Sequence, residues 1–72
     1  MYRVVKTVIT PMSVERSSLC TTNNFDTASF WFLNNHAKDT KMYEGRPCFR
    51  TKWGYVIRPD KYSTISVEIE QN

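Results

Sequence analysis

The stretch VVKTVIT, residues 4–10, most constrains how this chain folds, because six of its seven residues are β-branched. β-Branched side chains restrict the backbone to extended geometry and favour strands. Apolar side chains occupy both odd and even positions, which is typical of a central strand covered on both faces. Pro11 ends the pattern, since proline cannot donate a hydrogen bond to a neighbouring strand. We therefore predict a central strand over residues 2–10.

A strict alternation near the end of the chain predicts a second strand, over residues 62–70. Ile65, Val67 and Ile69 occupy one set of positions, and threonine, serine and glutamate occupy the other. Period-two alternation of this kind places one face of a strand on the core and the other in solvent.

The segment CFRTKWGYVIR, residues 48–58, also alternates, with aromatic and apolar residues at odd positions and cations at even ones. The rival reading is a two-residue hairpin that turns at Trp53 and Gly54. That turn would place the bulky Trp53 at positive φ, which is sterically unfavourable. We therefore predict one long strand, bulged at Gly54. A turn that begins at Pro59 connects it to residues 62–70.

Pairing of these two strands would bring charges of opposite sign together on the outer face. Glu68 and Glu70 are then expected to lie near Arg50 and Lys52, an arrangement worth roughly 0.2–1 kcal/mol per pair. Whether the two cations are paired in this way or remain open to a partner decides how the segment functions.

Residues 25–38, FDTASFWFLNNHAK, are compatible with two kinds of element. Asp26 is a good N-cap residue, which favours a helix. Four consecutive bulky residues, FWFL at 30–33, also fit a buried strand. We predict a helix over residues 27–36, with the strand kept as the alternative.

Packing the helix on the sheet predicts an α+β fold: a small antiparallel sheet of three or four strands with one helix on a face. Ala28 and Phe32 are expected to face the sheet. Residues 41–44 are a candidate fourth strand, and the Ser/Thr/Asn-rich residues 12–24 are expected to be irregular. A chain of 72 residues forms one domain at most, here residues 1–72.

Cysteine usage and hydropathy bear on the compartment. Cys20 and Cys48 permit a single disulfide, fewer than small secreted scaffolds usually carry. The N-terminus has no signal-peptide pattern, and no segment is apolar for long enough to span a membrane. We expect a cytoplasmic protein with two free thiols and no membrane contact, and keep a Cys20–Cys48 bridge as the alternative.

Motifs for catalysis or metal binding are missing from the sequence. His36 is the only histidine, and no local pattern brings either cysteine to it. Cys20, His36 and Cys48 lack the paired spacing of structural zinc ligands. The two glycines cannot form a phosphate-binding loop. We therefore expect no enzymatic activity, no cofactor and no metal site.

Basic residues are concentrated between Lys41 and Lys61, which contain six of the ten cations and two of the seven acids. Such a patch attracts polyanions. Alternation nevertheless separates its aromatic residues from its cations, so an ordinary strand with a charged outer face explains the segment as well. The candidate anion- or nucleic-acid-binding residues are Arg46, Arg50, Lys52, Arg58 and Lys61.

The aromatic run at 30–33 offers more apolar surface than one face of a short helix can bury. Phe30 and Trp31 are therefore candidate contacts for a protein partner, with Tyr43 as a third. We expect a non-enzymatic interaction protein that binds and modulates or inhibits a protein partner. Small motif-poor domains of this kind include phage-encoded inhibitors of host proteins. A basic nucleic-acid-binding domain is the alternative, and a homodimer would bury the same aromatic residues.

Overall fold

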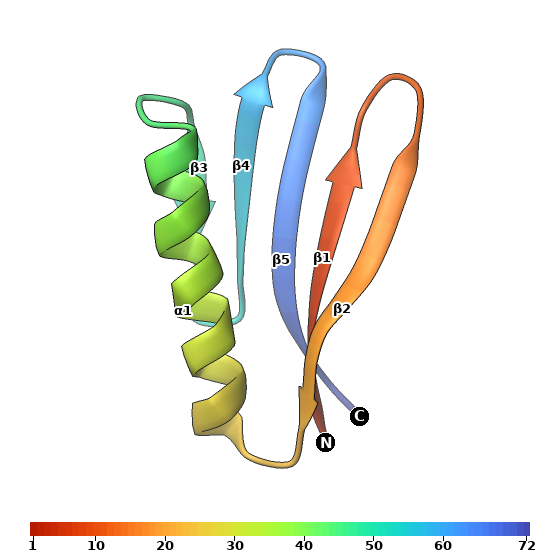
Figure 1. The fold of residues 1–72 in the computed structure, drawn as a ribbon, viewed down its shortest axis with the longest axis vertical. Helices are drawn as coiled ribbons and strands as arrows, with labels where there is room; N and C mark the ends of the chain where they lie inside the picture. The colour runs from red at the N-terminus through yellow and green to blue at the C-terminus, as the bar shows by residue number, and fades with distance from the viewer.

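The computed structural model describes all residues, 1–72, as five strands and one helix (Figure 1). Every pair of neighbouring strands is antiparallel, and the order across the sheet is β2-β1-β5-β4-β3. The chain termini lie side by side at one end of the sheet. The elements are β1 (Tyr2–Ile9), β2 (Val14–Thr22), α1 (Phe25–Met42), β3 (Cys48–Arg50), β4 (Gly54–Asp60) and β5 (Ser63–Gln71).

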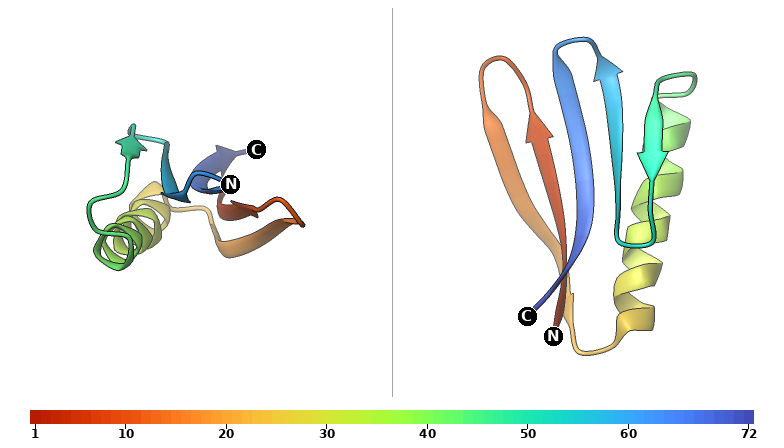
Figure 2. Two further views of the ribbon diagram at one scale, coloured as in Figure 1. Left: turned by 90° about the horizontal axis from the view of Figure 1, so that it is seen from above. Right: turned by 180° about the vertical axis from the view of Figure 1, so that it is seen from behind.

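The predicted α+β class is confirmed, although the sheet has five strands instead of three or four. α1 connects the two edge strands and packs on one face of the sheet, and no element covers the other face (Figure 2). Burial of apolar surface between α1 and the sheet stabilises the fold. The core consists of Val4, Ala28, Phe32, Tyr55, Ile57, Ile65, Val67 and Ile69.

The predicted alternation of β5 is confirmed, because Ile65, Val67 and Ile69 are all buried beneath the helix. β1 is a central strand, as predicted, and lies between β2 and β5. Its coverage differs from the expectation. Val4 packs beneath α1, whereas Val5 points to the uncovered face and is shielded there by neighbouring side chains.

The prediction of one long strand over residues 48–58 is wrong. The segment is a hairpin, in which a turn at residues 51–53 joins β3 to β4. The Thr51 hydroxyl accepts hydrogen bonds from the backbone N–H groups of Trp53 and Gly54, both at 3.2 Å. No residue of this turn has positive φ, so the steric objection to a two-residue turn does not apply to this longer one.

The hairpin reverses the expected faces of β3, because directly opposed residues of an antiparallel pair share a face. Arg50 lies opposite Tyr55 and therefore points to the helix-covered face. Phe49 lies opposite Val56 and points to the uncovered face, where it is 73% exposed. Phe49, which the alternation of residues 48–58 groups with Tyr55 and Ile57, therefore lies outside the core that these two residues share.

Residues 25–38 form a helix and not the alternative strand, and the helix is much longer than the predicted 27–36. It continues through the Asn34-Asn35 pair to Met42, so the predicted strand at 41–44 is wrong. Asn24, not Asp26, is the N-cap residue: its side-chain oxygen accepts from the backbone N–H groups of Asp26 and Thr27. Ala28 and Phe32 face the sheet, as predicted.

Residues 12–24, expected to be irregular, contain the nine-residue edge strand β2. A turn at 10–13, held by the Thr10 and Ser13 side chains and backbone, brings β2 against β1. The β1–β2 register shifts after Val4, because Val4 pairs with Cys20 and Val5 with Ser18, which leaves Leu19 as the extra residue. Leu19 and Cys20 both pack against the core. The exposed polar residues of β2 suit an edge position, where charge discourages unwanted pairing.

Candidate interaction surface

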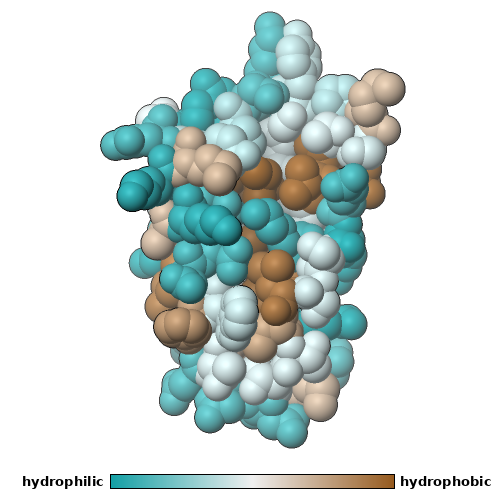
Figure 3. Space-filling model, viewed as in Figure 1, coloured by the Kyte–Doolittle hydropathy of each residue, from teal (hydrophilic) through white to brown (hydrophobic).

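One flank of the helix exposes two bulky apolar side chains, Phe30 and Leu33. They lie three residues apart and therefore share a side of the helix. Phe30 is 63% exposed and Leu33 is 46% exposed. In Figure 3, apolar atoms appear over α1 at the left of the view, surrounded by polar groups. Exposed apolar side chains gathered in this way are characteristic of interaction surfaces.

Two cations border this flank because the hairpin directs Arg50 toward the helix. A hollow of about 380 Å³ is lined by Leu33 and Phe32 of the helix and by Arg50 and Lys52 of the hairpin. The Lys52 ammonium lies 5.9 Å from the centroid of the Phe25 ring, within range of a cation–π interaction. We call the exposed side chains Phe30, Leu33, Arg50 and Lys52 the basic flank.

The expected pairing of Arg50 and Lys52 with the acids of β5 is wrong. Glu70 instead forms ion pairs with Arg3, at 3.3 Å, and with Arg16, at 2.5 Å. Arg3 lies directly opposite Glu70 on β1, and Arg16 lies one strand further, on β2. Arg50 and Lys52 form no ion pair, so their charges are available to a ligand.

The three other predicted cations lie together at the opposite end of the β3–β4 hairpin. The Arg46 guanidinium donates to the backbone oxygen of Arg58, and the Arg58 guanidinium donates to the backbone oxygen of Lys61. The Lys61 ammonium lies 5.0 Å from the centroid of the Tyr62 ring. The five cations that the sequence places in one segment therefore form two separate groups.

The three aromatic residues predicted to contact a protein partner, Phe30, Trp31 and Tyr43, also lie in different parts of the surface. Trp31 lies on the other flank of the helix, where it lines a groove of about 630 Å³ with Leu19, Lys38 and Lys41. Tyr43 is half-buried, packs against the core and caps the C-terminal end of the helix. Phe30 lines neither hollow; it is exposed one turn before Leu33 on the helix.

The structure brings Cys48 to His36, a contact that no sequence motif indicated. The Cys48 Sγ lies 3.9 Å from the His36 Nε2. Burial and then the nearby Arg50 charge lower the pKa of His36, which favours the neutral ring. The two cysteines are free and half-buried, so the predicted free thiols are present and the alternative bridge is not.

The same interior contains a buried polar group between helix and sheet. Asp39 is 3% exposed and accepts from the Tyr55 hydroxyl and from the Lys6 ammonium. No group of three or more histidine, cysteine, aspartate or glutamate side chains is arranged to hold a metal ion. The helix also lacks the long apolar run that crossing a membrane requires.

The arrangement of these residues offers an apolar anchor beside two uncompensated positive charges, on a frame made of α1 and the β3–β4 hairpin. Such a surface is chemically complementary to apolar side chains that are flanked by carboxylates. Comparisons with protein-family models, with curated proteins and with solved structures found no match to this chain.

Proposed function

We propose that the protein is a non-enzymatic interaction domain whose basic flank binds an acidic, apolar segment of a partner protein. The observation that carries the proposal is the proximity of Arg50 and Lys52, both without ion pairs, to the exposed Leu33. Phe30, one turn before Leu33 on the helix, extends the exposed apolar surface. The partner's apolar side chain would cover Phe30 and Leu33, and its carboxylates would pair with the two cations. Occupying the partner's surface in this way would modulate or inhibit its activity.

The positions of the cations favour a protein partner over a nucleic acid. The five cations form two groups at opposite ends of the hairpin, so they do not provide one continuous track for a phosphate backbone. Arg46 and Arg58 are also engaged with backbone oxygens, which leaves them fewer free donors. A basic nucleic-acid-binding domain is the outcome against which the proposal is tested.

The test measures binding of a short labelled peptide with two aromatic residues among glutamates, by fluorescence anisotropy. The wild type is expected to bind it, and Phe30→Ala, Arg50→Ala and Lys52→Ala are each expected to weaken binding several-fold. Lys38→Ala is the charge-matched control on the opposite flank of the helix and is expected to bind like the wild type. Equal weakening by Lys38→Ala and Lys52→Ala would contradict the proposed location.

A second titration uses mixed-sequence single- and double-stranded DNA and RNA at two salt concentrations. Phosphate contacts predict a steep loss of affinity with salt. Tighter binding of nucleic acid than of the acidic peptide, weakened by Arg46→Ala and Lys61→Ala, would replace the protein-binding function with the nucleic-acid-binding one.

A further inference from the structure

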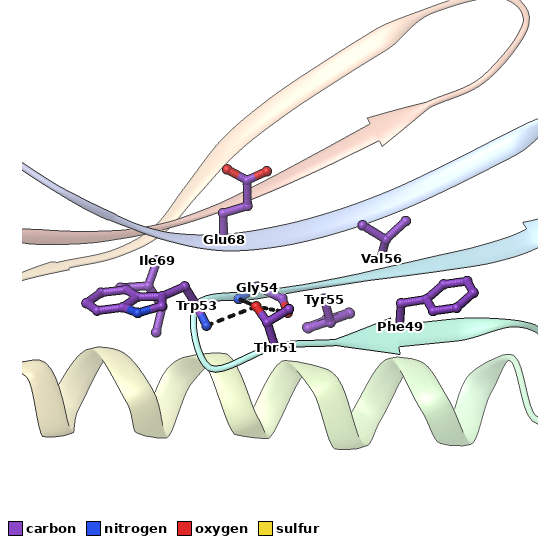
Figure 4. Close-up of a pocket in the computed structure, with 8 residues that line it drawn as sticks. All are labelled: Phe49, Thr51, Trp53, Gly54, Tyr55, Val56, Glu68 and Ile69. Carbon is purple, nitrogen blue, oxygen red and sulfur yellow. Dashed lines mark hydrogen bonds between the residues drawn. The ribbon is translucent and has the colours of Figure 1, made fainter.

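A second hollow, of about 340 Å³, opens at the turn end of the β3–β4 hairpin, toward the sheet face that the helix leaves uncovered (Figure 4). Phe49 lies at one end of it and Trp53 at the other, with Gly54 between them and Glu68 rising from β5. We call it the bare-face hollow. It does not involve the basic flank, whose cations point to the helix-covered side.

The walls of the bare-face hollow are aromatic and open. Phe49 is 73% exposed and Trp53 is 41% exposed. Trp53 is held in place by its neighbour Phe25, at 5.1 Å between ring centroids, and by the Thr51 hydroxyl that binds its backbone N–H. A ligand would therefore meet a largely pre-formed aromatic wall, which lowers the entropic cost of binding.

The floor of the hollow is backbone because position 54 is glycine. Gly54 lies directly opposite Glu68 on β5. A Cβ atom at position 54 would lie 3.2 Å from the backbone oxygen of Val67 and 3.5 Å from the Glu68 Cγ. The absent side chain thus keeps the space beside the glutamate open.

Glu68 is a negative charge without a partner on a chain of net charge +3. Its neighbour on the same face of β5, Glu70, is neutralised by Arg16 and Arg3, and the Arg16 hydrogen bond lowers the pKa of Glu70. No ion pair involves Glu68, which is exposed. The bare-face hollow therefore combines two aromatic walls with one uncompensated carboxylate.

We propose that the bare-face hollow binds an arginine side chain of a partner protein. A guanidinium is planar, stacks on aromatic rings and pairs with a carboxylate through two parallel hydrogen bonds. Glu68 would accept from its N–H groups, while the aromatic rings at the two ends of the hollow, Phe49 and Trp53, would contact the guanidinium and the aliphatic part of the arginine side chain. Lysine lacks the planar group, and a neutral or acidic side chain would leave the carboxylate unpaired.

The experiment follows two-dimensional NMR spectra while a short, end-blocked peptide with a single arginine among neutral residues is added. The Trp53 indole N–H and the Gly54 and Glu68 amides are expected to shift and saturate, while the Trp31 indole on the helix serves as an internal reference. Glu68→Gln is expected to weaken binding on the order of tenfold, and Phe49→Ala several-fold. Ser66→Ala, on the same face and without a role in the hollow, is the matched control.

Matched peptides decide the chemistry of the ligand. A citrulline peptide, which keeps the shape and lacks the charge, is expected not to bind, and a lysine peptide is expected to bind several-fold more weakly. Equal shifts with citrulline, equal affinity for lysine, or unchanged affinity in Glu68→Gln would each overturn the proposal. Shifts that depend on protein concentration before peptide is added would identify a second copy of this chain as the occupant, contrary to the proposal. Because the probe is basic, its failure is distinct from failure of the acidic peptide on the basic flank.

Discussion

The Tyr55 hydroxyl donates a hydrogen bond to the Asp39 carboxylate at 2.5 Å, across the interface between β4 and α1. The second Asp39 oxygen accepts from the Lys6 ammonium at 3.4 Å. Each oxygen of this nearly fully buried carboxylate thus has a donor, one from β4 and one from β1, the two strands that flank β5. A buried charge is costly unless it is paired and hydrogen-bonded, so this group favours one register of the helix over the sheet.

Tyr55→Phe is expected to lower the free energy of unfolding by roughly 1–3 kcal/mol, because it leaves one buried Asp39 oxygen without its donor. Urea denaturation followed by circular dichroism measures the change. Tyr62→Phe is the matched control, since Tyr62 is largely exposed and its hydroxyl forms no hydrogen bond. Equal stability of the two variants would show that the buried contact contributes nothing.

The pH dependence of stability is expected to include a contribution from His36, whose pKa burial and Arg50 lower from its ordinary value of 6.5. Between the lowered folded value and 6.5, the unfolded chain binds more protons than the folded one. Stability therefore falls as the pH drops below 6.5, and this contribution stops changing below the folded pKa.

Urea midpoints of the wild type and of His36→Gln, measured from pH 7.5 to about pH 5, test this sign. The variant is expected to show a flatter profile, because it lacks the His36 imidazole. Asp39 faces His36 and opposes the shift, while Tyr55 and Cys48 contact the ring. A wild-type protein that gains stability on mild acidification would contradict the assignment of a lowered pKa.

The alternation of Ile65, Val67 and Ile69 predicted β5 correctly, because its apolar period matches burial. The β-branched run predicted β1 through its extended backbone and not through a burial period, since Val4 and Val5 are buried on opposite faces and Ile9 is exposed. The length of the helix was not predictable from the same rule. Asp39 lies seven residues after Phe32 and is buried on the same side of the helix. Because this buried position holds a charged residue, the sequence shows no apolar helical period there. Only the partners from β1 and β4 make it compatible with the core.

The candidate sites were predictable as residue types and not as arrangements. Phe30, Arg50 and Lys52 were named from the sequence, but the place of Arg50 and Lys52 beside Leu33 of the helix depends on the turn at 51–53, which reverses the faces of β3. Thr51 carries the signal for that turn, through a hydroxyl that binds two backbone amides, and the long alternation through Trp53 concealed it.

Asn24→Ala is expected to cost about 1 kcal/mol of stability, because the Asn24 side chain binds the free amides of Asp26 and Thr27 at the start of the helix. The measurement is thermal or urea unfolding, with Asn23→Ala as the control one residue away. Asp26→Ala is expected to have a smaller effect, through loss of a favourable charge near the helix N-terminus. A larger loss for Asp26→Ala than for Asn24→Ala would restore Asp26 as the capping residue.

Gly54→Ala is expected to destabilise the protein by about 1–3 kcal/mol, because the new Cβ would press on the backbone oxygen of Val67, in a central strand that cannot easily move. Gly45→Ala provides the contrast. Gly45 has open space around it but a φ of 83°, so its substitution costs about 1 kcal/mol through backbone strain alone.

Asparagine separates the two mechanisms in the same unfolding measurement. It tolerates positive φ, so Gly45→Asn is expected to recover part of the stability that Gly45→Ala loses. At position 54 the larger side chain adds to the steric conflict, and Gly54→Asn is expected to be less stable than Gly54→Ala. Because the same substitution fills the floor of the bare-face hollow, Gly54→Ala is also expected to weaken binding of the arginine peptide. A stable Gly54→Ala protein with unchanged peptide affinity would contradict both the crowding at Val67 and the place of Gly54 in the hollow.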